Sequence, residues 1–355
     1  MSIRTLALVA LTAIVSSPAL ADDIADFYRG KELQIVIRAN PGGNYDTYSR
    51  LLGRHIVKHI PGNPTAVPRN MPGGGGLTAL NYVTNVAPHD GTVLTMVTAS
   101  MPMDQALGRN KRLTTDMRKL NWLGNMSDEN LFIVTTSKSP AKTLEDAKKR
   151  ETAMAATGSG GAESIVVALL NNLLGTKFKN IYGYRSSPEM NLSMERGETE
   201  ARMTTNLRAL FAAAATRPGS KGAADYNVIL QIGMEKATEY PNVPLLRDLA
   251  QGPDDKLVFD FLSQSVSLAR PIATNQDIPP TRVAALRKAF DATMKDPEFL
   301  AEATKMQLDI TPMTGADLQA AVTAIVDTPR PVLDRITKAL ATGAPSAERP
   351  KPAKK

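Results

Sequence analysis

The 355-residue sequence contains no cysteine. Disulfides, thiolate metal sites, cysteine nucleophiles and a lipid-modified cysteine anchor are therefore excluded, and the stability of the fold must come from core packing. Aromatic residues make up only 5% of the chain, and 42 basic against 35 acidic residues leave a formal charge of +7. A nucleic-acid-binding protein usually clusters basic and aromatic residues. No nucleic-acid partner is expected, and the mild positive charge suits attraction of a small anion.

Long hydrophobic runs are also scarce. The one long apolar run, "TLALVALTAIV", follows Arg4 and is shorter than the roughly 20 residues of a membrane span. "SSPALA" comes next and ends in small residues, which is typical of a secretory signal. We therefore predict a signal peptide over residues 1–21, cleaved after Ala21, and a mature, soluble protein exported to a bacterial periplasm.

What the sequence has is an alternation of strand and helix patterns joined by short turns rich in glycine and proline. Such alternation predicts parallel sheets with helical crossovers. The first unit is expected to contain the strand Leu33–Arg38, the helix Tyr45–Ile60, the strand Thr65–Arg69, the helix Leu77–Asn85, the strand Thr92–Thr98 and a helix near Met103–Leu107.

A second unit with the same alternation interrupts the first. We expect residues 22–128 to form the first part of lobe 1, 129–235 an inserted lobe 2, and 236–340 the second part of lobe 1, with a disordered basic tail over 341–355. The chain would cross between the lobes near Ser127–Leu131 and Gly233–Ala237. Two such crossings are typical of a hinged clamp around a cleft.

Two glycine-rich turns stand between a strand and a helix, at Pro41–Gly43 and within "ATGSGGAES", Ala156–Ser164. Helix N-termini at the carboxyl ends of strands offer free N–H groups, and glycine lets a ligand approach the backbone. Neither turn matches a P-loop or a dinucleotide fingerprint. Two facing turns would suit a carboxylate, although glycines that merely allow tight turns remain the alternative.

Three segments in order, "IVIRANPGGNYDTYSRLLGRHI", "RNMPGGGGLTALNYV" and "APHDGTVLTMVT", resemble the solute receptors of tripartite tricarboxylate transporters, the Bug-type periplasmic binding proteins. The likeness continues more loosely over most of the mature chain. It implies an α/β, two-lobed type-II periplasmic binding protein fold (a Venus flytrap), each lobe a mostly parallel sheet flanked by helices. It also implies capture of a small organic carboxylate for the permease subunits of a membrane transporter.

The resemblance also implies a set of ligand-binding positions. They are Pro41, Gly42, Gly43, Asn44, Tyr45, Asp46 and Thr47 in the first loop, Thr98, Ala99 and Ser100 after the third strand, and Gly158, Ser159, Gly160, Gly161, Ser164 and Asn206 in the other lobe. The chain departs from the family at Arg38 and Ala39, where an aromatic residue and a proline are common. It departs again at Arg185 and Ser186, where the family often has Lys-Gly.

Several of these side chains admit two roles. Arg38 and Arg185 are candidate counter-ions for a carboxylate, because a guanidinium can bind it with two hydrogen bonds; either could instead form a salt bridge. Tyr45 and Tyr184 could wall the pocket or simply pack. Asp46 could accept a hydrogen bond from the ligand, or cap the helix and hold the loop.

Catalytic and metal-binding patterns are weak. His55 and His59 have i, i+4 spacing but no third ligand, so we expect a solvated helix face, no metal and no cofactor. Serine-histidine catalysis lacks a nucleophile elbow. We expect a monomeric receptor that is not an enzyme. A binding protein serving a signalling partner, or less readily a periplasmic enzyme on the same fold, remains as an alternative.

Overall fold

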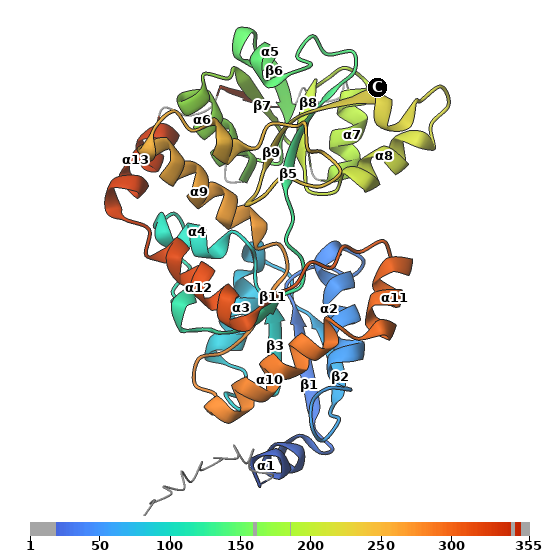
Figure 1. The fold of residues 1–355 in the computed structure, drawn as a ribbon, viewed down its shortest axis with the longest axis vertical. Helices are drawn as coiled ribbons and strands as arrows, with labels where there is room; N and C mark the ends of the chain where they lie inside the picture. The colour runs from blue at the N-terminus through green and yellow to red at the C-terminus, as the bar shows by residue number, and fades with distance from the viewer. Residues whose placement is uncertain (1–18, 159–161, 185, 342–344, 349–355) are drawn as a thin grey trace, which may run out of the picture.

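The computed structural model describes residues 19–158, 162–184, 186–341 and 345–348. Two α/β lobes lie one above the other along the longest axis, each built on a six-stranded sheet (Figure 1). The predicted two-lobed α/β fold is therefore confirmed. Within the described ranges, no helix combines the length and the apolar character needed to cross a membrane.

The sheet of lobe 1 is formed mainly by the N-terminal third of the chain and has the order β11-β4-β10-β3-β1-β2. Its strands are β1 (Glu32–Ile37), β2 (Thr65–Asn70), β3 (Val93–Met96), β4 (Asn121–Asn125), β10 (Pro271–Thr274) and β11 (Met313–Thr314). Its helices are α1 (Ala19–Tyr28), α2 (Asn44–Ile56), α3 (Leu77–Asn85), α4 (Met101–Ala106), α10 (Pro280–Thr293), α11 (Pro297–Lys305) and α12 (Gly315–Val326), with 3-10 turns at Gly74–Gly76 and Met117–Lys119.

The sheet of lobe 2 has the order β12-β7-β6-β8-β5-β9. Its strands are β5 (Leu131–Thr136), β6 (Thr152–Ala155), β7 (Phe178–Tyr182), β8 (Ala201–Thr204), β9 (Tyr226–Ile232) and β12 (Ser346–Glu348). The helices around it are α5 (Leu144–Lys149), α6 (Ala162–Leu174), α7 (Ser187–Glu195), α8 (Leu207–Ala215), α9 (Pro253–Ser267) and α13 (Arg330–Ala341), with 3-10 turns at Gly222–Asp225 and Leu246–Leu249.

Both sheets are mixed, and most strands of each run in one direction, as expected. The strands β1, β2 and β3 are parallel to one another, as are β6, β7, β8 and β12. The strands β10 and β5, however, run antiparallel to both of their neighbours. Each of these two strands enters its lobe from the crossing between the lobes, whereas its neighbours run toward that crossing. Their reversed direction is therefore a consequence of the insertion.

The return crossing lies further along the chain than expected. The first crossing, after β4, falls within the expected Ser127–Leu131. The second, expected at Gly233–Ala237, instead follows α9, because α9 packs on β9, α13 and the 3-10 turn before it. The two crossing segments are joined by an isolated antiparallel bridge between Asp128 and Leu268.

The C-terminal segment also differs from the expected division. Helix α13, expected in lobe 1, buries Val332, Leu333 and Ile336 and packs against α6 and α9. Strand β12, within the tail expected to be disordered, pairs in parallel with β7. The chain thus crosses between the lobes a third time, between α12 and α13. The expected signal segment before Ala19 and the tail after Glu348 lie outside the described residues.

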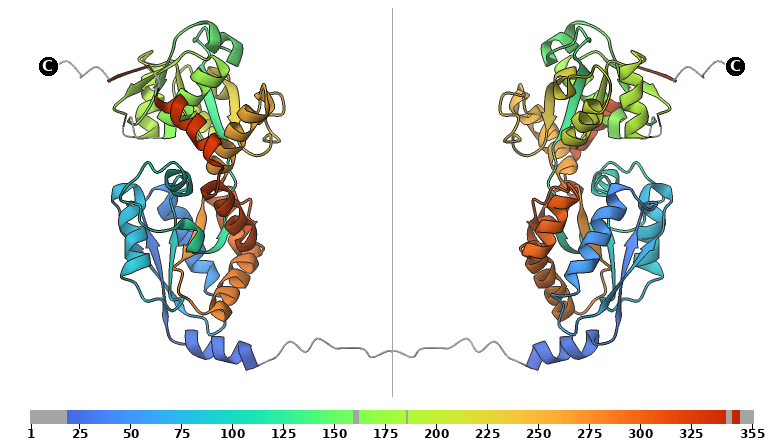
Figure 2. Two further views of the ribbon diagram at one scale, coloured as in Figure 1. Left: turned by 90° about the vertical axis from the view of Figure 1, so that its left-hand side faces the viewer. Right: turned by 90° about the vertical axis from the view of Figure 1, so that its right-hand side faces the viewer.

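One buried apolar cluster links the two lobes on the side of α9 and α12. It extends from Trp122 in β4, through Phe259 of α9 and Val322 of α12, to Met154 in β6. Trp122 is fully buried, and its indole N–H donates to the Met117 carbonyl at 2.8 Å. These helices therefore form a continuous packed connection beside the two crossing strands (Figure 2).

Candidate functional site

The turn between β1 and α2 is held in place by one carboxylate. Gly42 has φ +85°, a left-handed conformation that favours glycine. Its N–H donates to Asp46 Oδ2 at 2.9 Å, while Asp46 Oδ1 accepts from Arg50 Nε and from Asn70 Nδ2, each at 2.8 Å. Burial raises the pKa of Asp46, but these three hydrogen bonds lower it more, so its pKa lies below its usual value. The contacts correspond to the loop-holding role.

The first turn of α2 keeps its backbone donors available. Gly43 is the N-cap residue, with an extended backbone, and no side chain caps this end among the described residues. Thr47 Oγ1 turns back to donate to the Gly43 carbonyl at 3.1 Å. Pro41 and Asn44 are exposed beside it. An uncapped helix N-terminus of this kind presents N–H groups and a positive dipole end to an anion.

Arg38 lies against this turn without a carboxylate partner in the described chain. Its guanidinium carbon is 3.4 Å from the centre of the Tyr45 ring, and its Nε is buried with no acceptor among the described residues. The backbone N–H of Ala99 reaches the Tyr45 hydroxyl at a long 3.5 Å. The structure therefore brings together Arg38, Tyr45 and Ala99 from the predicted set.

The loop Gly73–Gly76 lies beside Arg38. Thr98 Oγ1 donates to the Gly75 carbonyl at 2.8 Å. Gly76 has φ +104°, and a Cβ atom there would overlap Thr98 Oγ1 and lie 2.8 Å from Arg38 Cδ. Ser100, next along the chain, directs its hydroxyl to Asp104 Oδ2 at 3.3 Å. In the sequence this loop appears only within one of the three segments that carry the family resemblance, and its contact with Arg38 was missed.

Arg270 was also missed, although it lies next to the predicted loop. It is almost fully buried at the second crossing, with its guanidinium carbon 4.7 Å from the Tyr48 ring centre and 5.3 Å from that of Tyr45. Its Nη2 is 3.0 Å from Oε1 of Glu129 on the first crossing. A lone arginine at the end of a long apolar helix gives no local signal for this position. Only the fold brings it to β1 and α2.

On the lobe 2 side, Ser164 holds the start of the second glycine turn. Its hydroxyl donates to the Gly158 carbonyl at 3.1 Å and lies 2.9 Å from the Tyr182 hydroxyl. Tyr184, a possible pocket wall, is instead buried with Ala155 and Met190 and serves as a packing residue here. Of the two roles considered for Tyr184, its burial in the lobe interior favours packing. Ser159, Gly160, Gly161 and Arg185 lie outside the described residues.

Two further polar side chains organise lobe 2. Asn206 caps α8, with its Oδ1 accepting from the Ala209 N–H at 2.7 Å. Arg202, which the sequence did not single out, is buried; its guanidinium donates to the Ser187 carbonyl at 2.9 Å, to the Ser187 hydroxyl and to Asn191 Oδ1. Burial lowers the pKa of Arg202 to about 10. This buried cation braces the start of α7, next to position 185.

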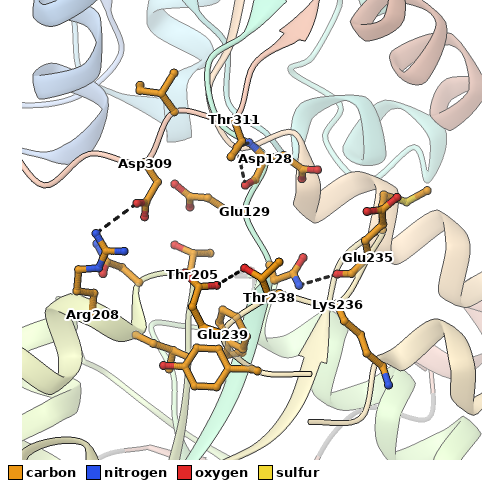
Figure 3. A pocket seen from close by; sticks show the side chains of 18 of the residues that line it. Asp128, Glu129, Thr205, Arg208, Glu235, Lys236, Thr238, Glu239, Asp309 and Thr311 are labelled. Carbon is orange, nitrogen blue, oxygen red and sulfur yellow. Dashed lines mark hydrogen bonds and ion pairs between the residues drawn. The ribbon is translucent and has the colours of Figure 1, made fainter. Parts of the chain in front are cut away.

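A cavity of about 750 Å³ lies beside the crossing strands (Figure 3). Asp309 of lobe 1 and Arg208 of α8 face each other across it, 3.6 Å apart. Of the predicted ligand-binding residues, only Asn206 lines it. The predicted loops around Arg38 and Gly158 do not line this cavity.

His55 and His59 do not lie on a solvated face, as the sequence suggested. His55 Nε2 is 2.6 Å from Glu302 Oε2, and His59 Nε2 is 2.9 Å from Asp296 Oδ2, both in the region of α11. Among the described residues, no group of three or more His, Asp and Glu side chains is arranged to hold a metal ion. The helical spacing that resembled a metal site instead pairs α2 with α11.

Comparison with known proteins identifies the fold of this chain. No protein-family model matches the chain, and no curated protein matches it significantly. Among solved structures, a TctC solute-binding protein from Polaromonas matches with a TM-score of 0.66 and 16% identity, over 89% of this chain and 99% of its own. The chain has the fold of periplasmic solute-binding proteins.

Two other structures of this fold have similar scores. The periplasmic binding protein BugD matches with a TM-score of 0.60 and 18% identity, over 90% of this chain and 100% of its own. MatC from Rhodopseudomonas palustris, solved with bound malate, has a TM-score of 0.60 and 17% identity, over 85% of this chain and 99% of its own. The solute-binding fold implied by the sequence resemblance is thereby confirmed.

Proposed function

We propose that this protein is a periplasmic receptor that binds a small organic carboxylate between its lobes and delivers it to a tripartite tricarboxylate-type membrane permease. The observation that carries the proposal is Arg38, a partly buried cation at the carboxyl end of β1 that has no carboxylate partner among the described residues. It stands beside the uncapped N-terminus of α2. A ligand carboxylate would provide the missing counter-charge.

The chemistry of the surrounding groups supports an anionic ligand. Asp46, the one carboxylate in the turn, has both oxygens occupied by Gly42, Arg50 and Asn70, so its charge is already compensated. The donors left over are backbone N–H groups at the start of α2 and the Arg38 guanidinium. Charge-assisted hydrogen bonds to a carboxylate are the strongest that such donors form.

The other parts of the proposal rest on the shared fold. MatC was solved with malate, and another R. palustris protein of this fold, with a TM-score of 0.61 and 15% identity, was solved with adipate. We propose the same class of ligand for this chain, together with periplasmic location after cleavage at Ala21, delivery to a permease and no catalytic activity. The sites proposed for lobe 2 are Gly158, Ser164 and Asn206, with the loop residues 159–161 and 185.

The test is a thermal-shift screen of purified residues 22–355 against aliphatic and aromatic carboxylates, with the corresponding amides as controls. A ligand at 100 times its dissociation constant should add about 2.7 kcal/mol to the free energy of unfolding. We expect a shift with one class of acid and none with its amide. No shift with any acid, or equal shifts with the amides, would contradict the proposal.

A pair of matched variants then locates the charge. Arg38→Gln should weaken binding of the acid by about tenfold or more, because a hydrogen bond to a charged group contributes about 1.5–3 kcal/mol. Arg112→Gln removes the same charge from an exposed loop and should leave the dissociation constant unchanged. Equal effects of the two substitutions would show that Arg38 only contributes to the general positive field.

A further inference from the structure

The charged side chains that leave a buried polar atom unpaired are gathered at one place. Among the described residues, eleven buried side-chain atoms have no hydrogen-bond partner, and the charged side chains concerned are Arg38, Arg270 and Glu129. Arg38 and Arg270 both stack on Tyr45, and Glu129 pairs with Arg270. Unsatisfied buried charge is costly, so its concentration around one tyrosine calls for a reason other than stability.

Arg270 lies next to the predicted binding loop but is buried. Its side chain is 8% exposed, so it has no direct access to a ligand in this conformation. Its Nη1 donates to the Ala269 carbonyl at 2.8 Å, while its Nε has no acceptor in the described chain. The guanidinium contacts the faces of Tyr45 and Tyr48, which lie in the first turns of α2. Arg270 therefore meets the predicted binding loop through these tyrosines.

Glu129 connects this arrangement to the crossing between the lobes. It lies on the segment between β4 and β5, and the Ser127 hydroxyl is 3.5 Å from its Oε1. Besides Arg270 and Ser127, the groups that influence the pKa of Glu129 are Thr205 of lobe 2 and Asp309 of lobe 1. The Tyr48 hydroxyl donates to the Asp309 carbonyl at 3.1 Å. Loop, crossing strands and both lobes thus meet at one buried ion pair.

We propose that Arg270 and Glu129 are positioning residues: their buried ion pair anchors Tyr45 to the crossing strands, so that carboxylate binding at the loop is coupled to movement of the lobes. The inference rests on the proposed function for its ligand but not for the anchoring itself. Both would act on the ligand through Tyr45, although Glu129 also lines the cavity beside the crossing strands. Arg270 Nε and Glu129 Oε2 have no partner among the described residues, so a second arrangement of the pair that gave them partners would be favoured when the crossing strands move.

The test uses a double variant, Arg270→Met with Glu129→Gln, because removal of both charges leaves neither one buried without its partner. The matched control is Arg150→Met with Glu200→Gln, which removes an ion pair of 2.6 Å in lobe 2. Hydrogen exchange of residues 38–47 is measured without ligand, followed by the dissociation constant for the acid found in the screen.

We expect exchange at residues 38–47 to accelerate, and the dissociation constant to rise, by about tenfold each in the double variant, with both unchanged in the control. If the double variant fails to fold, Arg270→Lys, which keeps the charge but loses the planar fork, should give a smaller change in the same direction. Unchanged exchange, or faster exchange with unchanged affinity, would overturn the inference. If the native protein binds no acid, the exchange result alone decides it, which separates this inference from the proposed function.

Discussion

The two ends of α2 differ in how their charged side chains are paired. At its C-terminal end, Arg54 pairs with Glu302, and Lys58, just beyond the helix, pairs with Glu298, while His55 and His59 place ring nitrogens against Glu302 and Asp296. At its N-terminal end, Arg38 lies over the face of Tyr45 and has no carboxylate partner among the described residues, and none of their side chains caps the helix. Pairing at one end fixes the helix to lobe 1, and this allows the other end to keep its donors unpaired for the ligand that we propose.

The comparison also indicates why the loop does not collapse. Unpaired donors are tolerable only if the backbone that carries them is held elsewhere. At the N-terminal end this is done by Asp46, whose carboxylate accepts three hydrogen bonds. One residue of α2, Asp46, thus stabilises the loop, whereas other groups at the start of the helix keep unpaired donors for the proposed ligand. Substitutions at the two ends should separate stability from binding.

The largest effect should come from Gly76→Ala. A Cβ atom there would overlap Thr98 Oγ1 and crowd Arg38 Cδ, and the residue has φ +104°. Strain of this kind costs about 1–3 kcal/mol, so we expect the free energy of unfolding to fall by about that amount and carboxylate binding to weaken. Gly75→Ala is the control, since it also has positive φ but has open space around it. Denaturant unfolding of both variants measures the difference; equal losses would mean that only backbone strain matters.

Asp46→Asn should have the next largest effect. The amide presents its NH₂ group to donors, and the loss of a hydrogen bond to a charged group should cost about 2 kcal/mol at neutral pH. Because the pKa of Asp46 in the folded protein lies below its ordinary value of 3.8, this stabilisation is present above that pH and is lost as the pH falls through the folded-state pKa. Unfolding curves of native and variant proteins should therefore converge in acid. A constant difference from neutral pH to pH 3 would contradict this.

The smallest effect should come from Glu302→Gln, at the paired end. His55 and then Arg54 lower the pKa of Glu302 below its ordinary value of 4.5. The unfolded chain therefore takes up the proton first, so the native protein loses stability as the pH falls below about 4.5 and the variant loses less. Glu298→Gln, at a more exposed position of α11, is the control. Carboxylate affinity at pH 7 should stay the same in both; an altered affinity would mean that the two ends are not independent.

Much of the fold could be predicted because its signals are local. The helix Leu77–Asn85 has the predicted bounds, β1 begins and ends one residue before the predicted strand, and β2 ends one residue later than predicted. The return crossing and the third crossing could not be predicted. Whether α9 and α13 pack on lobe 1 or lobe 2 depends on which apolar face they meet, and the sequence pattern of an amphipathic helix does not contain that information.

The candidate site likewise contains residues that a local motif predicts and residues that it does not. The turn at Gly42 and the neighbouring residues Arg38, Tyr45 and Asp46 follow one another in the chain, so a local motif was enough to find them. Arg270 and Glu129 join them only through tertiary contacts. Arg202 had no local pattern either, because a buried arginine held by neutral oxygens looks like any other charged residue in a strand.

The third crossing has a practical consequence. Helix α1 packs on α10 in lobe 1, whereas β12 is attached to the sheet of lobe 2, so the two ends of the described chain lie at opposite extremes of the molecule (Figure 1). A pair of fluorophores placed on α1 and β12 would span both lobes. A movement of one lobe relative to the other that changes the distance between the dyes would change the transfer efficiency, so the labelled protein would report lobe movement directly by fluorescence.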